Sequence, residues 1–148
     1  MTHAYDKIYL SKAQINLGRM LDYAVNDMKM GLREYYNYFL VSRISKSFAK
    51  GNPSYVVGRS GVELCYEVLD SIGLAYKKAK PHFSEERSQE YWTGWSLAFF
   101  QWYSGMDYSD IDRRVHIEKI RNLYDPFHEM DIRQFCDKMF DMMEKCDG

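Results

Sequence analysis

Sixteen consecutive residues, Glu90 to Gly105, read EYWTGWSLAFFQWYSG and contain every tryptophan of the chain. On a helix with 100° per residue, six of the rings in this stretch fall on one arc of about 120°. The rings on the arc are Tyr91, Trp92, Trp95, Phe99, Trp102 and Tyr103. Leu97 and Phe100 make the opposite side apolar as well. Because a helix that is apolar nearly all round is typical of a protein interior, the stretch predicts an all-α fold built around this helix.

The aromatic arc has three open interpretations: core packing, a docking face for another protein, or a cage around a ligand. A platform for nucleic-acid bases normally interleaves its rings with basic residues, and this helix carries none. Buried Trp and Tyr need partners for their N–H and O–H groups, so such helices often leave polar ring edges at a surface, where they act as binding hot spots. We predict four partner-binding residues here: Trp95, Gln101, Trp102 and Tyr103.

Apolar residues recur at helical spacing along the rest of the chain, which predicts a single-domain bundle, residues 1–148, of about five to seven helices. A first helix is expected over about 5–28, a second over about 32–48 and a last over about 130–145. Residues 74–89 are polar and interrupted by a proline, so they predict a linker and a candidate for mobility. Ser84 or Ser88 is expected to cap the aromatic helix.

The composition limits the classes of function. Twenty basic residues against twenty-one acidic ones give a net charge of −1, so there is no overall field for a nucleic acid, although a local basic patch stays open. The N-terminus has no apolar signal core, and the longest charge-free stretch, Tyr91 to Met106, is too short to span a bilayer. We therefore expect a cytoplasmic protein without membrane contact.

The cysteines and histidines show no pattern of a metal or disulfide site. Three cysteines, an odd number without paired spacing, predict reduced thiols. The four histidines are scattered, and no pair has the i, i+4 spacing of a helical zinc site. The sequence predicts neither a metal nor another cofactor.

The stretch AKGNPSYVVGRSGVEL, residues 49–64, contains two helix starts. Asn52 before Pro53 predicts a capped short helix, and Ser60 with Glu63 predicts a capping box. Ordinary capping explains these residues, while two helix N-termini near basic side chains leave an anion site as the alternative. We add three residues of this stretch to the predicted partner-binding set: Asn52, Tyr55 and Arg59.

RNLYDPFH, residues 121–128, supports a catalytic alternative. Arg121 and His128 resemble the loose R-x(4–6)-H signature of HEPN ribonucleases, which are small all-α proteins. The resemblance implies that the histidine assists proton transfer on RNA and that the arginine stabilises phosphate charge. The competing interpretation is that His128 caps or packs near the last helix, and Asp125 before Pro126 is expected to break the segment.

Residues 104–124 outline a helix-turn-helix, with Ser109 as the expected cap of its first short helix. This gives a second alternative, a DNA-binding regulator. The candidate phosphate contacts are Arg113, Arg114, Lys119 and Arg121. Four carboxylates in the same segment oppose them: Asp107, Asp110, Asp112 and Glu118.

Three blocks taken together, KGNPSYVVGRSGVEL, EYWTGWSLAFFQWYSG and LYDPFHEMDIRQFCDKM, resemble an uncharacterised family of small all-α bacterial proteins. This chain departs from the family pattern at Asp125-Pro126, because the family has the proline directly after the tyrosine. Genes of that family are similar to members of toxin–antitoxin modules and accompany an ADP-ribosyltransferase-like protein. The resemblance implies a non-enzymatic protein-interaction module, the antitoxin-like partner of a toxin, and leaves the oligomeric state open.

Overall fold

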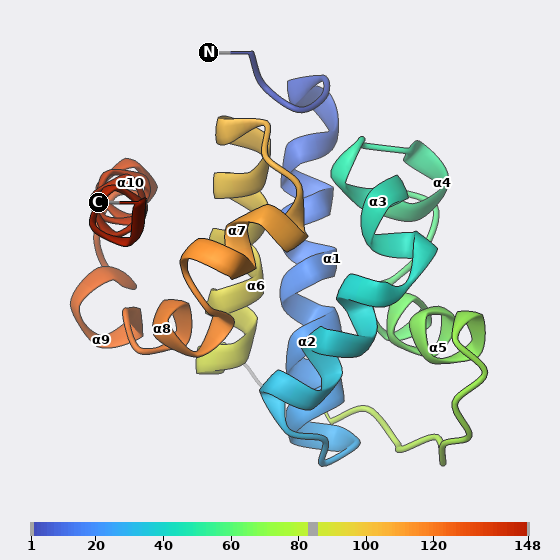
Figure 1. The fold of residues 1–148 in the computed structure, drawn as a ribbon. Coiled ribbons are helices and arrows are strands. Elements are labelled where there is room, and N and C mark those ends of the chain that lie inside the picture. The colour runs from blue at the N-terminus through green and yellow to red at the C-terminus, as the bar shows by residue number, and fades with distance from the viewer. Residues whose placement is uncertain (1, 83–85, 148) are drawn as a thin grey trace.

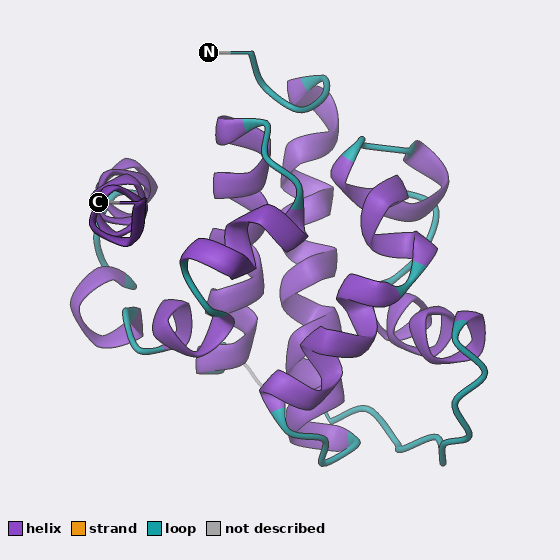
Figure 2. Cartoon of the chain, in the orientation of Figure 1, coloured by secondary structure: helices purple, strands orange, loops and turns teal. Residues whose placement is uncertain are grey.

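The computed structural model describes residues 2–82 and 86–147, and all regular structure in these ranges is helical (Figures 1 and 2). Two short helical segments, η1 and η2, flank the first long helix and extend it at both ends. In chain order the elements are η1 (Lys7–Tyr9), α1 (Leu10–Asp22), η2 (Tyr23–Asp27), α2 (Leu32–Val41), α3 (Arg43–Ala49), α4 (Pro53–Val56), α5 (Gly61–Ser71), α6 (Gln89–Ser104), α7 (Tyr108–Arg114), α8 (Ile117–Arg121), α9 (Tyr124–Phe127) and α10 (Ile132–Asp147). The all-α prediction is confirmed.

The helices α1 and α6 make the most extensive helix–helix contact of the described residues; they lie side by side and run in opposite directions (Figure 1). Glycines allow the two backbones to touch where they cross. A Cβ on Gly94 would lie 2.6 Å from the Leu17 carbonyl oxygen, and one on Gly18 would lie 2.7 Å from the Tyr91 carbonyl oxygen. Any side chain at either glycine would push the pair apart, and the central place predicted for the aromatic helix stays a prediction.

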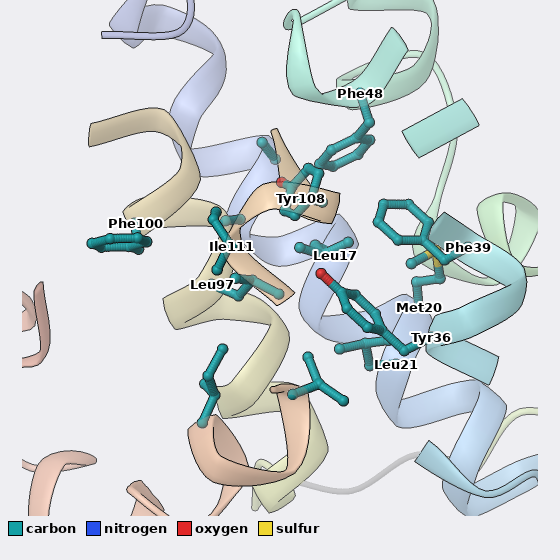
Figure 3. Close-up of a cluster of buried hydrophobic side chains, with 14 of the residues drawn as sticks. Leu17, Met20, Leu21, Tyr36, Phe39, Phe48, Leu97, Phe100, Tyr108 and Ile111 are labelled. Atoms are coloured by element: carbon teal, nitrogen blue, oxygen red, sulfur yellow. The ribbon is translucent and has the colours of Figure 1, made fainter. Parts of the chain in front are cut away.

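Three groups of helices cover α1: α6 on one side, α4 and α5 on another, and α2 on a third. Between α1 and α2, the side chains of Leu17, Met20 and Leu21 of α1 pack with Tyr36 and Phe39 of α2 (Figure 3). Other labelled residues extend this core toward α3, α6 and α7, namely Phe48, Leu97, Phe100, Tyr108 and Ile111. The fourth side of α1, which carries the exposed Ile15, is open.

Local sequence signals give most helix ends as predicted. The Asn52 side chain accepts from the Ser54 N–H, Ser60 and Glu63 form the capping box, and Ser88 accepts from the Tyr91 N–H. Gly105, at φ 75°, ends α6. Ser84, the alternative cap of α6, lies outside the described residues.

Three boundaries differ from the predictions. The helix expected over 32–48 is divided at Ser42, whose backbone is extended and whose hydroxyl donates to the Phe39 carbonyl at 2.7 Å. The N-cap of α7 is Asp107 and not Ser109. Pro126 lies inside the first turn of α9, where its missing N–H is not needed, so it does not break the segment. Together with the single turns these breaks explain why ten α-helical segments are described where five to seven were predicted.

The described part of the predicted linker, residues 74–82, lacks helix but is held by side chains of the core. The Tyr23 hydroxyl donates to the Ala79 carbonyl at 2.5 Å and accepts from the Ala79 N–H at 3.1 Å. Tyr76 donates to Asp70 at 2.9 Å, and His82 pairs with Asp27. Mobility of this segment stays a prediction. Within the described residues, no helix is both long and apolar enough to cross a membrane.

Candidate partner-binding site

The aromatic arc of α6 is divided between core and surface. Trp92 is 8% exposed and packs edge-on against Tyr124 of α9 and Phe135 of α10. Tyr91, Trp95, Phe99 and Tyr103 are half-buried. The arc therefore contributes one side to the core and leaves a row of ring edges, Tyr91, Trp95 and Phe99, at the surface.

The N-terminal segment covers the C-terminal end of the arc. Trp102 is 5% exposed, and its Nε1–H donates to the Tyr5 carbonyl at 2.8 Å. The Ala4 N–H donates to the Trp102 carbonyl at 2.9 Å, and the His3 ring stacks on the indole with 3.9 Å between ring centres. Trp102, predicted to bind a partner, is thus covered by residues of its own chain.

The open side of α1 lies beside this row of rings. Gln14 and Asn16 lie about 100° to either side of Ile15 on the helix. Gln14 donates to the Trp95 carbonyl on α6 at 3.4 Å, whereas Asn16 donates to the Val56 carbonyl on α4 at 2.8 Å. Ile15 therefore points outward between α6 and α4.

Two isoleucines make this open side apolar. Ile8 and Ile15, seven residues apart, are 73% and 39% exposed. Because α1 and α6 are antiparallel and touch at Gly18 and Gly94, the outward side of α1 continues into the outward side of α6. We call the combined surface the α1–α6 face; its residues are Ile8, Lys12, Ile15, Tyr91, Trp95 and Phe99.

Two clefts border the face along α6. The first, about 630 Å³, lies between Trp95 and the stacked pair Tyr124 and His128, with Arg87 at its rim. The second, about 590 Å³, lies between Phe99 and the start of α10 at Ile132. Both have the size of pockets that receive side chains or small ligands.

Charged groups of both signs surround the face. Lys7 and Lys12 are exposed and form no ion pair with another described residue. The Arg87 guanidinium lies 4.7 Å from the centre of the Tyr91 ring, and Glu86 lines the same cleft. Asp6 and Asp131 each accept from a backbone N–H, at 3.0 and 2.8 Å. The two lysines are the cations that carboxylates of a ligand could pair with.

The second predicted group, Asn52, Tyr55 and Arg59, lies at the other flank of the open side of α1. Asn16 joins the two by donating to the Arg59 carbonyl at 3.0 Å. The Arg59 guanidinium lies 4.6 Å from the centre of the half-buried Tyr55 ring and also pairs with Glu67. Asn52 is exposed and is used as a helix cap. Of the first predicted group only Trp95 lies on the α1–α6 face, and Tyr55 and Arg59 lie across the open side of α1 from it.

Gln101 has an internal role instead. It is 1% exposed, and its amide nitrogen donates to the carbonyls of Ala49 and Met106, both at 3.0 Å. These bonds join α6 to the end of α3 and to the turn before α7. The folded chain therefore leaves Gln101 out of reach of a partner, whereas Tyr103 beside it remains half-buried at the second cleft.

Arg121 and His128 are not joined by a hydrogen bond or ion pair in the described part of the chain. The Arg121 guanidinium lies 3.6 Å from the Glu90 carboxylate and ties α8 to α6. His128 stacks on Tyr124, and its Nδ1 donates to the Tyr124 carbonyl at 2.7 Å. The histidine borders the first cleft, and the arginine does not line it.

Ile8, Ile15 and Lys12 were not among the predicted site residues. The available signal was an apolar pair at i and i+7 on the otherwise polar side of the first helix. Its meaning depends on which helices cover the other sides of α1, and this is a property of the tertiary fold.

The remaining site chemistry is sparse. No three His, Cys, Asp or Glu side chains gather as a metal-ligand set among the described residues. All three cysteines are free, and burial raises the pKa of the Cys65 and Cys136 thiols to about 12, so both stay protonated at neutral pH. Comparison with protein-family models, curated proteins and solved structures found no match to the chain.

Proposed function

We propose that this protein is a non-enzymatic binding module that holds another protein on its α1–α6 face. One observation carries the proposal: half-buried Trp95 and Phe99 and exposed Ile8 and Ile15 belong to the outward sides of two antiparallel helical segments that touch at Gly18 and Gly94. Trp and Tyr with apolar neighbours are the residues from which interface hot spots are built. Contiguous apolar surface rimmed by charge is typical of a protein-interaction site.

The partner's chemistry follows from the clefts and the rim. The two clefts along α6 suit bulky apolar side chains spaced along a partner segment. Lys7 and Lys12 lack ion-pair partners among the described residues, so carboxylates of the partner would find cations there. The expected ligand is a segment with apolar anchors set among acidic residues.

The family resemblance suggests where such a partner is encoded. We expect a toxin-like protein from a neighbouring gene, neutralised by occupation of its surface. This part of the proposal rests on the resemblance of three sequence blocks and not on the geometry of the face.

Affinity capture with matched variants tests the binding proposal. Ile15→Glu and Trp95→Glu place a carboxylate in the face, while Val41→Glu does the same at a 74% exposed apolar residue of α2, outside the face. The wild type and the α2 variant should retain one protein at a stoichiometric ratio, and the two face variants should lose it. Equal capture by all four folded proteins, or recovery of nucleic acid alone, would exclude the face as the binding site.

A further inference from the structure

A basic hollow of about 340 Å³ lies where α7, α8 and the end of α10 meet. Five of its lining residues have basic side chains: Arg113, Arg114, His116, Lys119 and Lys145. They come from three separate elements, so the fold, and not one charged run, brings them together. The α1–α6 face does not include any of them.

Arg33 of α2 pairs with two carboxylates of the α7–α8 segment, neither of which lines the hollow. Its guanidinium bonds both oxygens of Asp112, at 2.8 and 3.0 Å, and its Nε–H donates to Glu118 at 3.0 Å. Asp112 also accepts from the Ile117 N–H at 3.1 Å. Two of the four carboxylates that oppose the basic residues in the sequence are therefore held by α2.

Two carboxylates near the hollow form ion pairs that are largely exposed to solvent. Asp110 pairs with Arg113, and Asp141 pairs with Lys145 at 3.2 Å, with side chains between 43% and 75% exposed. Ion pairs this exposed contribute little, so an anion of higher charge can displace them. Lys119 and His116 form no ion pair with another described residue.

We propose that this hollow binds a small anion carrying adjacent phosphates, of the pyrophosphate type. Guanidinium and ammonium groups from three sides match the oxygens of such an anion. The lining residues include no Phe, Tyr or Trp on which a base could stack. With five residues, α8 is also short for a recognition helix in a DNA groove. The basic side chains of the hollow therefore recognise the phosphate groups and not a base.

Isothermal titration of the full chain with pyrophosphate tests the site. Lys119→Gln combined with Arg113→Gln should weaken binding by about tenfold or more, because each loses a charge-assisted bond. Lys77→Gln removes a charge from an exposed position of the 74–82 segment and should leave the affinity unchanged. No binding by the wild type, or equal weakening in the Lys77 variant, would overturn the proposal.

A second arm identifies the source of the phosphates. A labelled single-stranded oligonucleotide is titrated in the presence and absence of pyrophosphate. The proposal expects that the oligonucleotide does not bind at this site. If the oligonucleotide binds tightly and pyrophosphate displaces it, the ligand of the hollow is a nucleic-acid backbone, and the small-anion proposal is wrong. Ile15→Glu should keep pyrophosphate binding, so this inference and the proposed function fail separately.

Discussion

At the residue scale, buried tyrosine hydroxyls divide into two kinds. Tyr23 exchanges hydrogen bonds with Tyr66 and with Ala79. The Tyr108 hydroxyl is buried and has no hydrogen-bond partner among the described residues, and burial raises its pKa well above the ordinary value. The same chemical change should therefore have opposite consequences at the two positions.

We expect Tyr108→Phe to leave the free energy of unfolding unchanged or raise it by up to about 1 kcal/mol, since it removes an unpaired polar group. Tyr23→Phe should lower the free energy of unfolding by about 1–3 kcal/mol, because it leaves the Ala79 groups unpaired. Urea titrations of both variants measure the difference. A larger loss in Tyr108→Phe than in Tyr23→Phe would contradict the assignment.

Gly94 leaves no room for a side chain, because α1 packs directly against its backbone. Gly94→Ala should lower the free energy of unfolding by about 1–3 kcal/mol, despite the better helix propensity of alanine, because the new Cβ meets the α1 backbone. Gly31→Ala is the comparison variant: the nearest atom to its Cβ would lie 3.9 Å away, so it loses only the preference of an N-cap for glycine over alanine. If thermal unfolding shows the two variants to be equally stable, the close contact of α1 with α6 is wrong.

At the element scale, Arg33 holds α2 against the segment α7–α8. Its hydrogen bond lowers the pKa of the Glu118 carboxyl below the ordinary value of 4.5. A carboxyl with a lower pKa in the folded chain stabilises the fold above its unfolded pKa, and this contribution is lost as the pH falls through the folded value.

Arg33→Gln should therefore lower the free energy of unfolding at pH 7 by about 1–2 kcal/mol. The deficit should shrink as the pH falls below 4.5, where the wild type loses the same contribution. Urea unfolding at pH 7 and at pH 3 gives both numbers. A deficit that grows toward acid pH would show that Arg33 acts by another route.

Helix ends were predictable because their causes are local. Asn52, Ser60 and Ser88 act on backbone groups within a few residues, and the structure confirms all three as caps. The break at Ser42 was not predictable from periodicity, because the apolar stripe continues through it from α2 into α3. The ion pairs of the α7–α8 segment were not predictable from its own residues for a related reason, since two of its carboxylates pair with an arginine about eighty residues earlier.

At the scale of the whole molecule, the fold separates two surfaces of different chemistry. The α1–α6 face is apolar with exposed lysines at its edge, and the described lining of the hollow at α7, α8 and α10 is basic without large apolar rings. The aromatic run predicted one long helix, and α6 spans Gln89–Ser104 and packs against α1. Which of its rings reach the surface follows only from the crossing at Gly18 and Gly94 and from the N-terminal segment over Trp102.

Photocrosslinking in cells tests the central claim most directly. A benzoylphenylalanine in place of Ile15 probes the α1–α6 face, and the same residue in place of Val41 probes the surface of α2. The account predicts one discrete protein adduct from the Ile15 position and none from Val41. No adduct at Ile15, or the same adducts at both positions, would contradict the assignment of the α1–α6 face as the surface that binds a protein.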